Sequence, residues 1–361
     1  MGFREIENDI KSGAVNRPAP ILLFGEEGFL VSFYQRKLEA LFASDEGNDD
    51  VYTSVNELDV SVFHGSESAD DEAVMSALDT FPMFSPLRVV IVKDHPGLSS
   101  PGQNAGTEAE DSAKKPSGLT GYIAQLPDTA RLIFSSGSVN KTRALYKAIA
   151  KHGAVYEFQR LDEADLVNFA RKRFRAFGAG ITPDILNAFL FATGYLEKDS
   201  DCDLFSVENE AYKLASFVLA EGRDEVSNRD IEECLPGVLR TDVFAMLDAI
   251  SSGRKPEAVR LLENSLAAGE NAFRLLSLFT GHFEIMLGFK ELSAAGHSSN
   301  EITRILGERS KWRVEKLGGF ARRLDKGKLE FILGRLYDME RQIKSGDIQE
   351  HLALTVLLAE I

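Results

Sequence analysis

Short apolar runs alternate with helical stretches over the first 160 residues, and this alternation stops after residue 159. The runs at residues 21–24, 87–92, 131–134 and 154–158 are rich in Val, Ile, Leu and Phe, with helical spacing of apolar residues between them. Buried strands that alternate with helices are typical of a parallel sheet covered by helices on both faces. Residues 1–160 therefore predict an α/β domain.

Helical periodicity takes over from residue 161 to the end of the chain. A basic helix at 166–177 and an apolar-faced helix at 205–219 indicate a small helical unit, and Leu235-Pro236-Gly237 marks a plausible boundary. Beyond it, the 3.6-residue spacing of apolar side chains predicts one further helix at the end and helices at 241–252, 256–267, 271–294, 300–306, 312–323 and 327–344. The sequence thus predicts a small helical domain at 161–237 and an all-α domain at 238–361.

Composition narrows the class of protein. The net charge of −15 over 361 residues argues against DNA as a sole, tight ligand, because nucleic-acid affinity comes largely from neutralised phosphates. Two cysteines without paired spacing and no long apolar run predict a cytoplasmic protein with no membrane contact. The polar, Gly- and Ser-rich stretch at 97–118 is expected to be a mobile surface insertion.

The turn after the first strand lies where a phosphate-binding loop would sit. It contains Gly25, Glu26, Glu27 and Gly28, with no Gly-Lys-Ser/Thr to hold phosphate and Mg²⁺. The strand at 131–134 ends in Ser135-Ser136 and not in an acidic pair that would hold magnesium. We therefore expect a degenerate site that binds no ATP.

No other catalytic pattern stands out in the chain. The six histidines are scattered without metal-ligand spacing, and no Gly-x-Ser-x-Gly occurs. We expect neither catalytic residues, nor a metal, nor a cofactor.

Two features with large apolar or aromatic side chains are candidates for binding a partner. Phe81, Met83 and Phe84 lie between or beside Pro82 and Pro86, just before the strand at 87–92. From the residues alone, packing of all three side chains onto the sheet edge is favoured over an exposed wedge on a stiff turn.

The second feature is the single tryptophan, Trp312, between Lys311 and Arg313. Residues 303–328 hold nine Lys/Arg and three Asp/Glu, so this segment is basic in an acidic chain. The ring either stacks on a nucleic-acid base near phosphates or packs between helices of the C-terminal domain.

Taken in order, several segments resemble the delta subunit of the clamp loader of bacterial DNA polymerase III. They are residues 21–30 (ILLFGEEGFL), 82–85 (PMFS), 135–147 (SSGSVNKTRALYK) and the pattern of DVFAMLDAI, LLE, AAGE and RLL between 242 and 276. The resemblance spans most of the chain and depends on the order and spacing of these pieces.

This resemblance implies an AAA+-like α/β domain, a small helical lid domain and a helical collar domain. It also implies a subunit without hydrolytic activity, working within the DNA polymerase III holoenzyme, that binds the beta sliding clamp and springs one clamp interface open. Met83 and Phe84, beside Phe81, match the hydrophobic pair of the family's clamp contact, with Met in place of Leu, which reverses the preference for burial.

Further partners follow from the same resemblance. They are the ATPase subunits and delta prime of the loader, and primed DNA inside the assembled loader. Trp312, with Lys311 and Arg313, matches an aromatic position that stacks at the primer–template end in some family members. Two rivals remain: a divergent AAA+ ATPase, and a helical scaffold with an incidental α/β domain.

Overall fold

The computed structural model describes residues 2–43, 57–65, 70–99, 118–197, 200–235 and 238–361. They form two compact units, residues 1–160 and 161–361. Within the described ranges, no helix is both long and apolar enough to cross a lipid bilayer.

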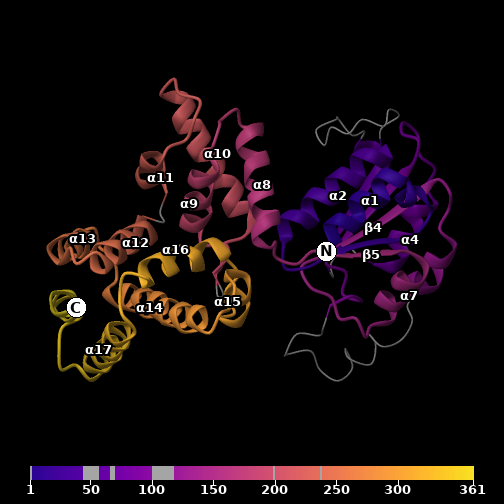
Figure 1. Cartoon of the computed structure of the whole chain (residues 1–361). Helices are drawn as coiled ribbons and strands as arrows, with labels where there is room; N and C mark the ends of the chain where they lie inside the picture. The colour runs from indigo at the N-terminus through magenta and orange to yellow at the C-terminus, as the bar shows by residue number, and fades with distance from the viewer. Residues whose placement is uncertain (1, 44–56, 66–69, 100–117, 198–199, 236–237) are drawn as a thin grey trace. The chain divides into compact units, whose positions relative to one another are not determined.

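The first unit is built on a sheet with helices around it (Figure 1). Among the described residues the sheet has five strands, in the order β2-β3-β4-β1-β5. Every neighbouring pair is parallel. The strands are β1 (Ile21–Phe24), β2 (Val60–His64), β3 (Arg88–Lys93), β4 (Ala130–Ser136) and β5 (Ala154–Glu157). The α/β class expected from the sequence is confirmed.

Helices cover both faces of this sheet. They are α1 (Gly2–Ser12), α2 (Gly28–Ala43), α4 (Asp71–Asp79), α6 (Gly118–Tyr122) and α7 (Ala144–His152). Apolar residues of α4, α6 and α7 share one core with Leu22, Val90 and Leu132 of the strands, whereas α2 contacts β1, β3 and β4. Because successive strand residues point to opposite faces, continuous apolar runs are what a sheet covered on both sides requires.

The sequence prediction missed β2 and misplaced one boundary. β2 is an edge strand with the sequence Val-Ser-Val-Phe-His, and its polar Ser61 and His64 interrupt the apolar run that marks the other four strands. The insertion expected at 97–118 cannot begin at 97, because Leu98 is fully buried in the sheet core. Residues 100–117 of that insertion and residues 236–237 of the predicted boundary lie outside the described part of the chain.

The second unit is helical. Its helices are α8 (Glu163–Ala176), α9 (Pro183–Thr193), α10 (Leu204–Ala220), α11 (Asn228–Cys234), α12 (Val238–Ser251), α13 (Lys255–Ala267), α14 (Ala272–Ala294), α15 (Ser299–Ile305), α16 (Lys311–Ala321), α17 (Lys326–Ser345) and α18 (Glu350–Glu360). From α12 onward they follow the predicted ranges to within a few residues. β-structure among the described residues of this unit is confined to one bridge between Gly180 and Glu225.

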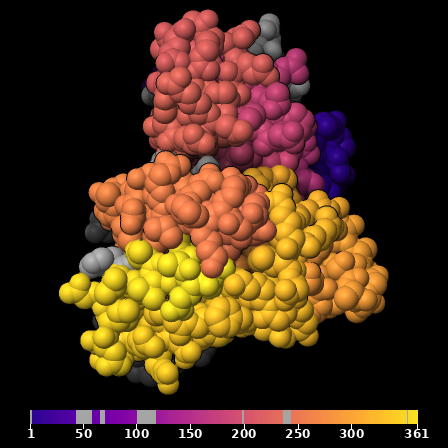
Figure 2. Space-filling model, turned by 60° about the vertical axis from the view of Figure 1, so that its left-hand side comes forward, coloured from indigo at the N-terminus to yellow at the C-terminus, as the bar shows by residue number. Residues whose placement is uncertain are grey.

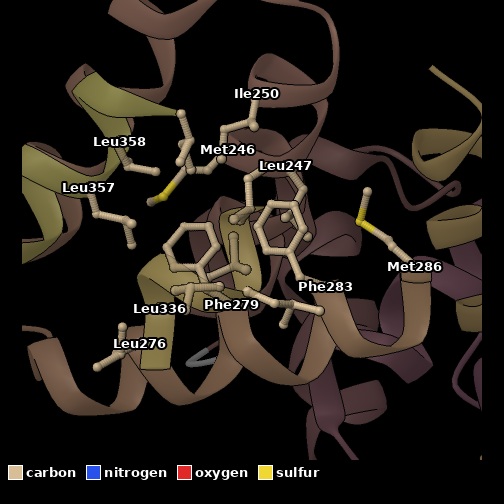
Figure 3. Packing of buried hydrophobic residues seen from close by; sticks show 14 of the residues in the cluster. Met246, Leu247, Ile250, Leu276, Phe279, Phe283, Met286, Leu336, Leu357 and Leu358 are labelled. Carbon is tan, nitrogen blue, oxygen red and sulfur yellow. The ribbon is translucent and has the colours of Figure 1, made fainter. Parts of the chain in front are cut away.

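One apolar core joins the helices from α12 to α18. Phe279 and Phe283 of α14 point toward Met246 and Leu247 of α12, with Leu357 of α18 close by (Figure 3). Figure 2 shows the last residues of the chain lying against α13, a contact that closes the bundle. We keep the division of this unit at 237/238 as a proposal.

Candidate partner-binding site

The connection between α4 and β3 exposes three large apolar side chains. The exposed fractions are 75% for Phe81, 80% for Met83 and 58% for Phe84. We call residues 81–86 the apolar turn. The expectation from the residues alone, that these side chains pack onto the sheet edge, is therefore wrong.

The backbone of the apolar turn is fixed although its side chains are exposed. Asp59 Oδ1 accepts a hydrogen bond from the N–H of Met83 at 2.8 Å, and its Oδ2 accepts from the N–H groups of Phe84 and Ser85, both at 2.6 Å. The Asp59 residue is only 1% exposed. Burial raises the pKa of this carboxyl group, but the three backbone donors and Arg88 outweigh it, so the pKa lies below its ordinary value.

Asp59 in turn is attached to the sheet. It directly precedes β2, and the register that pairs Val60 with Val89 sets it next to Arg88, the first residue of β3. The Arg88 guanidinium donates to Leu58 O at 3.0 Å and to Ser61 Oγ at 2.7 Å, and its Nη1 lies 3.9 Å from Asp59 Oδ1. Asp59 and Arg88 were not singled out from the sequence, because neither belongs to a local motif.

The exposed surface also includes a residue beside Asp59. Leu58 is 68% exposed, and it precedes Asp59 in a short 3-10 helix, Glu57–Asp59. Its exposure, like that of the apolar turn, is visible only in the folded chain.

The apolar turn and the glycine turn lie at opposite ends of the parallel strands. The apolar turn precedes β3, whereas residues 25–28 follow β1, and the two strands run parallel through β4. In open parallel sheets, small ligands bind at the carboxyl ends of the strands. A partner held by the apolar turn would therefore leave the nucleotide position free.

The glycine turn is closed against the end of β5. Gly25 has φ +142°, and a Cβ on it would lie 2.1 Å from the Phe158 carbonyl oxygen. The Glu27 N–H donates to the same Phe158 oxygen at 3.1 Å, and the Glu27 residue is only 1% exposed. Glu26 and Gly28 are exposed, and Gly28 begins α2. A backbone amide that a phosphate-binding loop would offer to an anion is thus engaged within the chain.

An acidic residue follows β3, the strand next to the one that ends in Ser135-Ser136. Asp94 follows β3 with φ 51°, and its Oδ1 accepts from Ser136 Oγ at 3.0 Å. Ser136 ends β4, the strand whose end the sequence prediction considered. The part of the chain that the structure describes contains no group of three His, Cys, Asp or Glu side chains that could hold a metal ion.

Trp312, near the start of α16, lies in an aromatic cluster. Its ring centroid is 5.6 Å from that of Phe191 on α9 and 6.3 Å from that of Phe244 on α12. The Lys316 ammonium lies 4.7 Å from the centre of the Trp312 ring. Lys316 as a whole is exposed, and partial desolvation of its ammonium group beside these rings lowers its pKa. Trp312 is half-buried and packs against the Phe191 and Phe244 rings, while stacking on a nucleic-acid base stays a prediction.

Glu163 of α8 caps the helix that carries Trp312. Its Oε1 accepts from Ser310 Oγ at 2.7 Å and from the Trp312 N–H at 3.2 Å, and its Oε2 accepts from the Lys311 N–H at 2.9 Å. A carboxylate at a helix N-terminus satisfies free N–H groups and complements the helix dipole. Glu163 lies almost 150 residues away in sequence, so nothing near Trp312 indicated it.

The cations beside Trp312 are paired with acids. Arg313 Nη1 lies 3.2 Å from Glu308, and the exposed Lys311 Nζ lies 3.6 Å from Glu315. Farther along the basic segment, Arg323 pairs with Asp248 at 2.6 Å. The surplus of positive charge counted from the sequence is thus partly neutralised by acids from inside and outside the segment.

Two family models match most of the chain. A family model described as DNA polymerase III, delta subunit, matches residues 22–159, and one described as DNA polymerase III delta subunit, C-terminal domain, matches residues 240–361. A comparison with curated protein sequences finds no match.

Two solved structures are similar to the chain. The Bacillus subtilis DNA clamp loader delta protein is 21% identical, with a TM-score of 0.51 over 100% of this chain and 99% of that one. A DNA polymerase III gamma subunit-related protein from Thermotoga maritima is 14% identical, with a TM-score of 0.34 over 99% of this chain and 98% of that one. The first of these shares the fold, a parallel α/β unit followed by a helical unit.

Proposed function

The chain belongs to the family of DNA polymerase III delta subunits, and from that premise we propose that it is the clamp-opening subunit of a replicative clamp loader. It binds the beta sliding clamp through Phe81, Met83 and Phe84 and opens one interface of the ring. The opened ring is then loaded on primed DNA.

The exposure of the apolar turn is the observation that carries this proposal. Three large apolar residues within a stretch of four are exposed on a folded unit, and such a concentration of apolar surface marks an interaction site. Each side chain of this size contributes about 1.5–3 kcal/mol when it leaves water. Three of them docked in one pocket supply much of the binding free energy of a specific complex.

Opening requires no reaction on this chain. A ligand shifts a closed–open equilibrium only by its different affinities for the two states. The apolar turn opens the ring if its pocket on the clamp fits better when the neighbouring interface is apart. Because the turn has a fixed backbone, it can hold the clamp in that geometry without first becoming ordered itself.

We further propose that ATP hydrolysis belongs to the ATPase subunits of the loader, which assemble with this chain and with delta prime. The glycine turn supports this division, since Phe158 engages the Glu27 amide and no lysine is present. Equilibrium dialysis of the purified chain with Mg-ATP tests it directly. Tight, magnesium-dependent binding would favour the divergent ATPase instead.

Primed DNA is proposed as a ligand of the assembled loader rather than of this acidic chain alone. Contact of Trp312, Lys311 and Arg313 with that DNA stays a prediction. The packed Trp312 ring would have to present its remaining exposed edge or leave Phe191 and Phe244.

A pull-down with the sliding clamp tests the central proposal. The chain carrying Met83→Ala and Phe84→Ala should lose clamp binding while keeping its melting temperature, because both side chains are largely exposed. A chain carrying Phe331→Ala and Leu352→Ala is the matched control, since these residues are 49% and 50% exposed in the other compact unit. Clamp binding within a few-fold of wild type by the Met83/Phe84 variant would exclude the apolar turn as the contact.

A further inference from the structure

The apolar turn combines two properties that rarely occur together. Its side chains are exposed, yet the segment has neither helical nor strand structure of its own between Thr80 and Arg88. An irregular surface connection ordinarily samples many conformations. Ordering it on binding costs conformational entropy, which weakens the affinity for a partner. Something in the fold has to hold this turn for it to act as a rigid contact.

The Asp59 carboxylate is placed to do this. It accepts from three consecutive backbone N–H groups, and two of them belong to the exposed residues Met83 and Phe84. Hydrogen bonds from N–H groups to an ionised carboxylate are stronger than those between neutral groups. Two oxygens that receive three converging donors leave the backbone of residues 83–85 little freedom.

The carboxylate is itself on a rigid support. Asp59 stands at the amino end of β2 beside Arg88, and the Arg88 guanidinium holds Leu58 O and Ser61 Oγ on either side of it. The side chain of Asp59 is only 2% exposed, so it is shielded from water and out of reach of a partner protein. Asp59 therefore contacts the turn and not what the turn binds.

We propose that Asp59 is the positioning residue of the clamp contact: its buried carboxylate fixes the backbone of residues 83–85 in the binding conformation before the clamp arrives. This inference rests on the proposed function of the apolar turn. Asp59 contributes to clamp affinity by removing the ordering cost from the binding step, and it contributes no contact of its own.

Asp59→Asn is the direct test, measured as the dissociation constant of the full chain from the sliding clamp. The amide has the size of the carboxylate, but its NH₂ group would face backbone donors in place of an acceptor oxygen. We expect the affinity to fall by roughly tenfold or more, because the turn must then be ordered on binding.

Asp230→Asn is the matched control. Asp230 is 2% exposed, accepts the Ser227 N–H at 2.8 Å and pairs with Arg223, but it lies in the other compact unit. The clamp affinity of the Asp230→Asn chain should stay within about twofold of wild type, since Asp230 makes no contact with the apolar turn. Equal losses of affinity in both variants would mean that lost stability, and not positioning, is the cause.

The Met83→Ala, Phe84→Ala chain separates this inference from the proposed function. If that chain binds the clamp normally, the proposed function fails whatever Asp59 does. If it loses binding while Asp59→Asn binds like wild type, the proposed function stands and the positioning role is overturned.

Amide hydrogen exchange gives a second measurement that a general loss of stability would not mimic. In the wild-type chain, the Met83, Phe84 and Ser85 amides should exchange slowly, and in Asp59→Asn they should exchange faster while amides of β3 keep their protection. If Asp59→Asn does not fold, the exchange rates of these three amides in the wild-type chain still test the proposal. Exchange of all three wild-type amides at the rate of an unstructured peptide contradicts the proposal.

Discussion

The N–H group of Phe84 donates to the buried carboxylate of Asp59 at 2.6 Å, although the Phe84 side chain on the same residue is 58% exposed. One residue is thus anchored through its backbone and presented to solvent through its ring. The anchor lies 25 residues earlier in the chain, at the start of the neighbouring strand. This arrangement makes a rigid apolar projection from a segment without regular structure.

Clamp affinity should depend on an apolar side chain at position 83 and not on methionine in particular. Met83→Leu keeps the volume and apolarity of the side chain, so clamp affinity should change by less than about tenfold. Met83→Asp would place a charge in an apolar pocket and should weaken binding by at least about a hundredfold. Surface plasmon resonance with immobilised clamp measures both, and equal affinities would contradict an apolar contact.

Gly25→Ala should destabilise the first compact unit. Its Cβ would lie 2.1 Å from the Phe158 carbonyl oxygen, in a backbone conformation of φ +142° that L-residues rarely adopt. We expect a loss of at least about 2 kcal/mol in the free energy of unfolding. Chemical denaturation followed by circular dichroism provides the measurement.

Gly319→Ala is the control for that substitution. Gly319 lies within α16, and a Cβ there meets nothing within 4 Å. Replacing it should leave stability unchanged or raise it by up to about 1 kcal/mol, because alanine favours the helix. A loss as large as that of Gly25→Ala would show that steric contact with Phe158 is not the cause.

Trp312→Ala distinguishes the two roles of the ring. Since Trp312 packs against Phe191 and Phe244, its removal should lower the free energy of unfolding by about 2 kcal/mol, less than the 3–5 kcal/mol of a fully buried aromatic residue. Trp312→Phe should recover part of this loss. A chain that melts like wild type but weakens primed-DNA binding by the assembled loader, measured by fluorescence anisotropy, would instead assign the ring to DNA.

Acid should remove the stabilisation supplied by Asp230. The Arg223 guanidinium and the Ser227 N–H and hydroxyl groups hold the pKa of Asp230 far below its ordinary 3.8, in spite of burial. A group with a lowered folded-state pKa stabilises the fold fully above its unfolded pKa, and this contribution disappears as pH falls through the folded value.

The melting temperature of wild type should therefore exceed that of Asp230→Asn most at neutral pH. The difference should shrink as the pH falls below 3.8. Thermal melts of both chains between neutral and acidic pH measure it. A difference that does not depend on pH would mean that Asp230 acts through its shape and not its charge.

Much of the fold could be predicted from local patterns. The inner strands β1, β3 and β4 carry continuous apolar runs and β5 begins with a shorter one, while the helices from α12 to α18 repeat apolar residues at helical spacing, so both were found. β2 was not found, because Ser61 and His64 interrupt its apolar residues and leave no continuous run. For the candidate site, the position of Met83 and Phe84 was identified only through the resemblance to a family, since the residues alone favoured their burial.

The sequence by itself determined the α/β-then-helical architecture and the absence of a lysine from the glycine turn, because both depend on residues close together in the chain. Tertiary structure decided that Phe81, Met83 and Phe84 are exposed, that Asp59 holds their backbone, and that Trp312 packs on Phe191 and Phe244. The partners in these contacts come from segments tens of residues to more than a hundred residues apart. Periodicity and spacing report which face of an element is apolar, but they do not report which distant side chain meets it.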